Sequence, residues 1–216
     1  ARVVVIEARG KAFCAGHDLH EMRAHADAEN GGEQWQRDLF KKCSGFMQTL
    51  INIPQPVIAK VQGLATAAGC QLVANCDLAI AANECKFGVS GINLGLFCST
   101  PSVALSRNLS RKRAFQMLMT GDFISAAQAV DWGLLNKCVA ADALDAEVNL
   151  LANQICQKSQ VAVTTGKTLF YKQLEKPLDE AYELAGNAMA CYMMSDDVKE
   201  GIDAFFEKRE PSWKNR

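Results

Sequence analysis

Long apolar runs are missing from the sequence. Runs such as Val-Val-Val-Ile at residues 3–6 are far shorter than the roughly 20 apolar residues that a helix needs to cross a bilayer. We therefore expect no transmembrane helix. The 216 residues are 49% hydrophobic and 22% charged, which is ordinary for a globular domain with a sizeable core.

An excess of charge of one sign is missing as well. Lys and Arg number 23 against 24 Asp and Glu, so the formal net charge is −1 and the isoelectric point is about 6.4. A chain with this balance lacks the positive field that binds a phosphate backbone or an anionic membrane surface. Nucleic acid is therefore not an expected partner.

Disulfide and metal-ligand motifs are absent too. The nine cysteines stand in apolar contexts without a Cys-x-x-Cys pair, at positions 14, 43, 70, 76, 85, 98, 138, 156 and 191. This spacing is typical of reduced, buried thiols in an intracellular compartment. His17 and His20 lie three residues apart, but no cysteine cluster with ligand spacing accompanies them. No metal site is expected.

The first part of the chain alternates strand-like and helix-like segments. Strands are expected at 2–8, 56–63, 77–82 and 86–89, and helices at 19–26, 33–51 and 67–74. Pro54 and Pro56 end the helix at 33–51 and keep the next residues extended. Alternation of this kind with short connections predicts an α/β core over residues 1–140.

From residue 101 onward the pattern indicates helices only. Ser125 and Gln128 form a capping box, Trp132 closes that helix, and Gly133 stops it. Further helices are expected at roughly 142–158, 161–173, 178–194 and 197–208. We interpret residues 141–216 as a helical C-terminal region that packs on a neighbouring subunit.

Two loops are rich in small residues. Phe-Cys-Ala-Gly-His-Asp-Leu occupies 13–19 after the first strand, and Gly-Leu-Ala-Thr-Ala-Ala-Gly-Cys occupies 63–70. Small side chains let a ligand approach the backbone, and the second loop opens a helix whose first N–H groups point outward. Two such N–H groups could bind one developing oxyanion, each typically contributing about 10² to 10³ in rate. The same residues would also allow close packing of helix on strand, so the pattern alone leaves both interpretations open.

Five motifs follow one another along essentially the whole chain. They are KAFCAGHDLHEM (11–22), PVIAKVQGLATAAGCQLVANCDLAIA (56–81), FGVSGINLGLFCSTP (87–101), LMTGDFISAAQAVDWGLLNKCV (118–139) and EGIDAFFEKREP (200–211). Together they resemble the crotonase family of enoyl-CoA hydratases and isomerases, enzymes of fatty acid metabolism. The resemblance implies a spiral of ββα units, assembly as trimers or paired trimers, and a mitochondrial location. The family's opening hairpin and first helix have no counterpart in this sequence, which is expected to lack them.

The resemblance also implies a ligand, an acyl-CoA thioester, with CoA as part of the substrate and no separate cofactor. The thioester carbonyl oxygen would lie between the main-chain N–H groups of His17 and Ala68. His17 departs from the small residue usual in the family. The adenine end of CoA would lie against the backbone around Ala15, Leu19 and His20. Lys208 matches a basic residue that reaches the nucleotide, often from the next subunit. The family often has a lysine at the position of His20, which leaves one phosphate contact open.

The two glutamates that move protons in the resembling hydratases are replaced here by Gln71 and Gly91. An amide can hold a water molecule but cannot accept its proton near neutral pH, and glycine has no side chain. General acid–base terms are worth about 10² to 10⁴ each, so hydration is expected to be very weak. Replacing both residues by glutamate is expected to restore some hydration if the pocket is otherwise intact.

Other groups near these loops could take over proton transfer: His17, Asp18, Glu21, Cys98 and Ser99. Asp18 is more simply a loop cap, Cys98 a buried thiol, and Asp77 a residue that fixes the start of a strand. Two functions remain open. One is an acyl-CoA enzyme limited to steps such as isomerisation or enolate formation, and the other is a non-catalytic acyl-CoA binding or regulatory protein. A protease-like function would need a Ser/His/Asp set, whereas all three histidines fall within residues 17–25.

Overall fold

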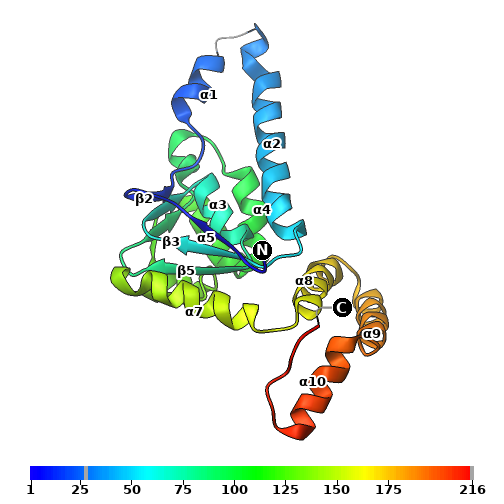
Figure 1. Cartoon of the computed structure of the whole chain (residues 1–216). Coiled ribbons are helices and arrows are strands. Elements are labelled where there is room, and N and C mark those ends of the chain that lie inside the picture. The colour runs from blue at the N-terminus through cyan, green and yellow to red at the C-terminus, as the bar shows by residue number, and fades with distance from the viewer. Residues whose placement is uncertain (27–28, 215–216) are drawn as a thin grey trace. The chain divides into compact units, whose positions relative to one another are not determined.

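The computed structural model describes residues 1–26 and 29–214 (Figure 1). Contacts along the chain divide it into two compact units. The larger one, which we call the sheet unit, holds residues 5–51 and 57–148. The other, which we call the helical unit, holds residues 1–4, 52–56 and 149–216.

Strands of the described residues form two four-stranded sheets. The first sheet has the order β1 (Val4–Glu7), β3 (Val57–Val61), β5 (Leu78–Ala82), β8 (Lys137–Val139). The second has the order β2 (Ala12–Cys14), β4 (Leu64–Thr66), β6 (Lys86–Gly88), β7 (Ile124–Ser125). Pairing is parallel from β3 to β8 and from β2 to β6, and antiparallel between β6 and β7. From β1 to β6, consecutive strands therefore alternate between the two sheets.

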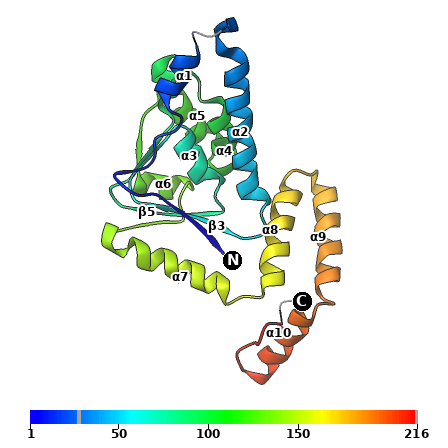
Figure 2. The same ribbon diagram turned by 45° about the horizontal axis from the view of Figure 1, so that its top comes forward.

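A helix follows each of the first three strand pairs. These helices are α1 (Leu19–His25) with α2 (Glu33–Asn52), then α3 (Ala68–Asn75), and then α4 (Ser99–Asn108) after a short 3₁₀ helix at Ser90–Leu94. Two more, α5 (Arg111–Thr120) and α6 (Ala126–Trp132), complete the sheet unit. In Figures 1 and 2, α3, α4 and α5 lie together on one side of β3 and β5. This repeat confirms the expected α/β spiral of ββα units.

The core of the sheet unit is centred on β3 and β5. Val57, Ile58 and Val61 of β3 are fully buried, as expected for a parallel strand that is covered on both faces. The carboxylate of Asp77, just before β5, accepts a hydrogen bond of 2.6 Å from the main-chain N–H of Val57. Asp77 therefore fixes the start of two neighbouring strands, and its expected structural role is confirmed.

The helical unit contains α8 (Gln160–Leu174), α9 (Leu178–Tyr192) and α10 (Asp196–Glu207), and α7 (Leu144–Cys156) leads into it. α8 and α9 lie side by side in both views (Figures 1 and 2). The segment after α10 runs back along that helix. The Trp213 indole donates a hydrogen bond of 2.7 Å to the Gln157 carbonyl oxygen, and the main-chain N–H of Lys214 donates one of 2.7 Å to the buried Asp197 carboxylate.

Several details differ from the sequence-based expectations. The expectation of helices only after residue 101 is wrong, because β7 and β8 extend the two sheets. β2 and β4 were not expected as separate strands. Each of these strands has two or three residues, too few to show alternation of polar and apolar side chains. The capping box of Ser125 and Gln128 is confirmed, as is the stop of α6 at Gly133.

Candidate functional site

The two small-residue loops meet in the sheet unit. β2 and β4 are parallel neighbours, so the loops that leave their carboxyl ends start side by side. A Cβ placed on Gly16 would lie 3.0 Å from the Ala67 Cβ and 3.3 Å from the main-chain nitrogen of Ala68. A Cβ on Gly69 would lie 2.0 Å from the carbonyl oxygen of Cys14. Larger residues at either glycine would push the two loops apart.

The turn into α3 is strained. Ala67 has φ 51° and ψ −121°, a conformation that L-residues rarely adopt and that tends to occur at functional sites. The main-chain N–H of Ala67 donates a hydrogen bond of 3.0 Å to the Gly88 carbonyl oxygen, and no side chain caps the helix there. The first-turn N–H groups of α3, beginning with Ala68, have no acceptor within the helix and carry the positive end of its dipole.

His17 lies in the loop between β2 and α1. Its ring packs edge-on against Phe40 of α2, with 5.5 Å between ring centroids. Nε2 is buried and has no hydrogen-bond partner among the residues that the structure describes. Burial lowers the pKa of His17 below its ordinary value of 6.5. The imidazole is therefore neutral near pH 7, and a neutral ring adds no charge beside its own main-chain N–H.

Gln71 lies three residues into α3 and is 4% exposed. Its backbone is satisfied, because its N–H donates to the Ala67 carbonyl oxygen at 3.1 Å and its carbonyl oxygen accepts from the Asn75 side chain at 3.0 Å. Its side-chain Oε1 is buried without a partner within residues 1–26 and 29–214. Buried polar atoms are paired in the large majority of cases, so this one requires an explanation.

Gly91 lies in the 3₁₀ helix at Ser90–Leu94, where its Cα is closely surrounded. A Cβ at this position would lie 2.7 Å from the Cys98 Sγ and 2.7 Å from the Leu96 carbonyl oxygen. The Leu96 N–H donates a hydrogen bond of 3.0 Å to the Gly91 carbonyl oxygen, which fixes the backbone on that side. Position 91, which the sequence predicted to correspond to the second glutamate, is therefore closed to any side chain unless the loop moves.

Cys98 is 8% exposed and precedes α4, so the expected buried thiol is confirmed. It also lies near α3. The pKa of the Cys70 thiol is raised to about 12, mainly by burial, with a smaller increase from the nearby Cys98 and an opposing decrease from a hydrogen bond with the Gly88 backbone. Ser99 donates its hydroxyl hydrogen bond to the Phe97 carbonyl oxygen at 3.2 Å. Cys98 thus lies between the α3 region and Gly91, whereas the Ser99 hydroxyl is engaged locally.

The loop proposed for the adenine end of CoA is exposed. Ala15, Leu19 and His20 are all exposed at the start of α1. Asp18 is the N-cap of this helix, because its Oδ1 accepts hydrogen bonds from the main-chain N–H groups of His20 at 2.8 Å and Glu21 at 3.3 Å. The expected capping role of Asp18 is confirmed, and the carboxylate is used in that role.

Lys208 belongs to the helical unit. It ends α10 in a left-handed conformation, with φ 55° and ψ 41°, and its side chain is exposed. The next residue, Arg209, pairs with both carboxylate oxygens of Glu200, at 2.6 and 3.1 Å. This pair holds the chain on the C-terminal side of Lys208.

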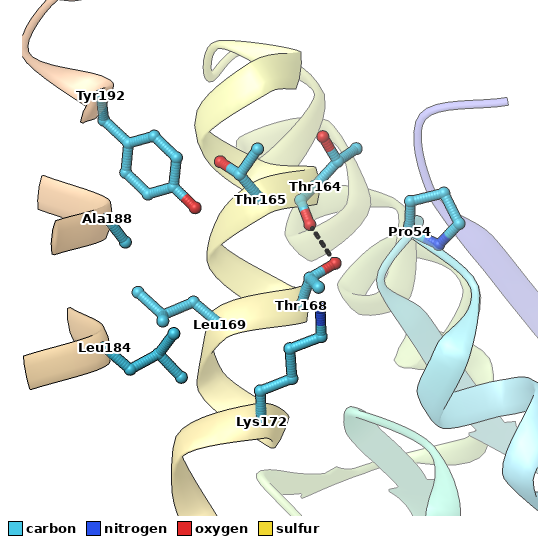
Figure 3. A pocket seen from close by; sticks show the side chains of 9 residues that line it. All are labelled: Pro54, Thr164, Thr165, Thr168, Leu169, Lys172, Leu184, Ala188 and Tyr192. Atoms are coloured by element: carbon cyan, nitrogen blue, oxygen red, sulfur yellow. Dashed lines mark hydrogen bonds between the residues drawn. The ribbon is translucent and has the colours of Figure 1, made fainter. Parts of the chain in front are cut away.

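A separate open groove lies within the helical unit and encloses about 290 Å³. Figure 3 shows Leu169 of α8 facing Leu184 and Ala188 of α9, with the Tyr192 ring directed at α8 and Lys172 extending along it. The groove contains none of the residues that the sequence pointed to. It is therefore not part of the candidate site.

Two other kinds of site are absent from the described part of the chain. Residues 1–26 and 29–214 contain no group of three or more His, Cys, Asp or Glu side chains arranged to hold a metal ion. Within the same residues, no helix is both long and apolar enough to span a membrane.

Two interleaved sheets built from ββα repeats, with two loops that converge on an uncapped helix start, define a crotonase-type protein. The family model described as enoyl-CoA hydratase/isomerase matches residues 1–216, and the chain belongs to this family.

Individual relatives agree with this assignment. The chain is 46% identical over 212 residues to the mouse protein named enoyl-CoA hydratase domain-containing protein 3, mitochondrial, covering 98% of this chain and 69% of that one. A Thermus thermophilus protein named putative enoyl-CoA hydratase is 32% identical over 210 residues, covering 97% and 82%. The mitochondrial location expected from the sequence agrees with the name of the mouse relative and of its human counterpart.

Solved structures are similarly close. The crystal structure of an enoyl-CoA hydratase from Mycobacterium smegmatis has a TM-score of 0.93 and 53% identity, covering 98% of this chain and 80% of that one. The human enoyl-CoA hydratase domain-containing protein 3 has a TM-score of 0.92 and 46% identity, covering 98% and 82%. These similarities confirm the crotonase fold.

The structure brings some of the predicted site residues together. It places the loop of His17 against the start of α3, near Ala68, and it places Gly91 against Cys98. The sequence pointed to these loops through their small residues. It gave no sign of the contact between His17 and Phe40, because those residues are distant along the chain and an aromatic residue on a helix is ordinarily core.

Proposed function

We propose that the sheet unit binds an acyl-CoA thioester with its carbonyl oxygen between the main-chain N–H groups of His17 and Ala68. One observation carries this proposal: the Gly16 backbone lies against Ala67 and Ala68, at the uncapped start of α3. Both donors belong to the backbone, so the His and Ala side chains do not remove the oxyanion site. Each donor would stabilise a developing enolate by about 10² to 10³ in rate.

The rest of the CoA contacts the exposed backbone around Ala15, Leu19 and His20 in this proposal. Lys208 of a neighbouring subunit supplies a positive charge for the nucleotide phosphates. Its exposed side chain and fixed left-handed backbone support this role. The thioester carries its own CoA, and no further cofactor takes part.

The reaction is limited by the residues at the two glutamate positions. Gln71 offers an amide, which cannot remove a proton from water near neutral pH, and Gly91 has no room for a side chain. We therefore propose that hydration is very weak. We propose instead a reaction that relies on the oxyanion site, such as isomerisation of an enoyl thioester through an enolate. The neutral His17 imidazole would act as the base.

A second candidate function is non-catalytic binding of acyl-CoA, with a regulatory role in fatty acid metabolism. The crowding around Gly91 favours it, because the contacts of Cys98 and Leu96 occupy the place where a second carboxylate would act. Binding through the oxyanion loops would persist without that carboxylate.

Assembly as a homotrimer or hexamer is also part of the proposal. Large apolar side chains on α9 and α10 are exposed in the single chain, among them Leu178 at 74%, Tyr182 at 71% and Phe205 at 79%. Large apolar side chains that are this exposed are typical of surfaces that other proteins cover.

The test is a mass-spectrometric time course of the purified full chain with saturated, 2-enoyl and 3-enoyl CoA thioesters. A shift of the double bond, without gain of the mass of water, is the expected result. Unchanged thioesters under conditions in which they bind would favour the non-catalytic candidate. Absence of binding by all of them at millimolar concentration would overturn the proposal as a whole.

A further inference from the structure

Lys208 occupies a position at the end of α10 that helices ordinarily give to glycine. The Arg209 N–H donates to the Ala204 carbonyl oxygen at 3.0 Å, and the Lys208 N–H donates to the Phe205 carbonyl oxygen at 3.3 Å. These two bonds form a Schellman motif, in which the left-handed residue is usually glycine because glycine has no Cβ. At Lys208, with φ 55° and ψ 41°, a long side chain is kept in a conformation that is unfavourable for L-residues.

Packing within the chain does not explain why this side chain is kept. Lys208 is exposed, and its ammonium group has no ion pair or hydrogen bond with any residue that the structure describes. Two carboxylates of the same helix, Glu200 and Glu207, pair with Arg209 instead. The ammonium group of Lys208 is therefore available to an anion from outside the chain.

The residues after Lys208 turn back along α10. We call residues 209–214 the C-terminal strap. Its contacts lie on one face of α10, because residues three and four apart share a face. They are the Ser212 N–H on the Glu200 carboxylate at 2.7 Å, the Trp213 ring 3.3 Å from a Cβ placed on Gly201, and the Lys214 N–H on the Asp197 carboxylate at 2.7 Å.

Glu200 joins the strap to the left-handed turn. Its side chain is only 15% exposed. Its two carboxylate oxygens accept hydrogen bonds from Arg209 at 2.6 and 3.1 Å, and one of them also accepts from the Ser212 N–H. These bonds, those of Arg209 most of all, lower the pKa of Glu200 to about 2, so the carboxylate is charged near neutral pH. One carboxylate thus holds the residue directly after Lys208 and a second residue three further along.

We infer that Glu200 is a positioning residue for CoA binding, because it holds Lys208, through Arg209 and the strap, where its ammonium group meets the nucleotide phosphates. This inference rests on the proposed function. It gives the two adjacent cations separate roles. The planar guanidinium of Arg209 binds a carboxylate at two points within the chain, whereas the Lys208 ammonium is a point charge left for phosphate. A backbone fixed in advance loses less freedom when the ligand binds, so the clamp raises affinity.

Glycine at position 208 separates binding from stability. Lys208→Gly suits the left-handed turn, so the midpoint of thermal unfolding of the full chain is expected to rise by about 2 °C. Calorimetry should show about 10-fold weaker binding of butyryl-CoA, since the cation is lost. Binding of butyryl-pantetheine, which has no nucleotide, should be unchanged. A lower midpoint, or unchanged binding of butyryl-CoA, would overturn the inference.

Glu200→Gln removes the charge that pairs with Arg209 and keeps the size of the side chain. It is expected to weaken binding of butyryl-CoA about 3- to 10-fold and to leave butyryl-pantetheine unchanged. In the Lys208→Gly chain the same substitution should have no further effect, because no cation remains to be positioned. Glu180→Gln is the matched control. It breaks the exposed pair with Lys176 in the same unit and should leave both affinities unaltered.

The failures of the inference and of the proposed function are distinguishable. Three results for Glu200→Gln would overturn the inference and leave acyl-CoA binding standing: no change for butyryl-CoA, an equal loss for both ligands, or the same loss when position 208 is glycine. The last two would show that Glu200 only supports the fold. Absence of binding of both ligands by the unaltered chain would overturn the proposed function, and the inference with it.

Discussion

At the scale of single residues, the lack of a side chain at position 91 is enforced by its neighbours. The Cys98 Sγ and the Leu96 carbonyl oxygen both lie where a Cβ would be. One of these is a flexible side-chain end, but the other is backbone, so the loop would have to shift to admit any larger residue.

Restoring both glutamates is therefore expected to fail, in contrast to the expectation from sequence for an intact pocket. Gln71→Glu with Gly91→Glu should regain no measurable hydration of a 2-enoyl thioester and should lower the free energy of unfolding by about 1–3 kcal/mol. The readouts are water addition by mass spectrometry and urea unfolding. Gln71→Glu alone is the control for the buried charge. Hydration by a double variant of unaltered stability would show that the loop accommodates the side chain.

His17 gives a pH dependence whose sign follows from its environment. Burial lowers its pKa in the folded state, so the folded chain binds this proton less readily than the unfolded chain, where histidine titrates near 6.5. The contribution of His17 to the free energy of unfolding is constant well above pH 7. It becomes destabilising as the pH falls below about 6.5.

NMR titration of the His17 ring is expected to show a midpoint below 6.5. His17→Phe keeps an aromatic ring against Phe40 and should lose less stability between pH 7 and pH 5 than the unaltered chain. A His17 midpoint at or above 6.5 would contradict the edge-on, buried placement of the ring.

Sequence and structure contribute differently to these residues. The sequence alone shows which residue types stand at positions 71 and 91. It therefore also shows that neither position carries a strong proton acceptor. The crowding at Gly91 and the unpaired Oε1 of Gln71 depend on residues that the fold brings near, such as Cys98, and no local pattern encodes them. The assignment of the individual site residues stays a prediction until a ligand is bound.

At the scale of elements, the expected helices mostly match the observed ones, whereas the short strands do not. α2, α8 and α9 each have at least 15 residues, long enough for a helical period to show in the sequence. β4 and β8 have three each and form because they pair with neighbouring strands, which is a property of the assembled sheets.

Glycines within helices provide a test at this scale. Gly45 of α2 has open space where a Cβ would be, so Gly45→Ala is expected to raise the free energy of unfolding by about 0.5–1 kcal/mol. In α10, a Cβ on Gly201 would lie 3.3 Å from the Trp213 ring, so Gly201→Ala should gain less or lose stability. Urea unfolding of both variants measures the difference. An equal gain would mean that Trp213 is not held against α10.

At the scale of the whole molecule, the exposed apolar side chains of the C-terminal helices require partners. Phe205 and Phe206 at the end of α10 are 79% and 75% exposed. Two adjacent phenylalanine side chains are not ordinarily left uncovered in a protein that stays a monomer in water. The proposed homotrimer would cover such surface.

Sedimentation of the full chain is expected to give a trimer or hexamer. Phe205→Asp should shift it toward monomer, because a charge in an apolar interface lacks a partner. Lys199→Ala, an exposed change on the same helix, should leave assembly unaltered. A monomeric unaltered chain at all concentrations would contradict the proposed assembly.

The strand order has a consequence for how the chain acquires its structure. In both sheets, neighbouring strands follow one another in chain order, β1, β3, β5, β8 and β2, β4, β6, β7. During synthesis, each new strand can therefore join an edge that already exists, and no strand has to insert between two others. Pulsed hydrogen exchange should then find the amide protons of β3 and β5 protected before those of β8. The sheets would therefore grow in the same direction as the chain emerges from the ribosome.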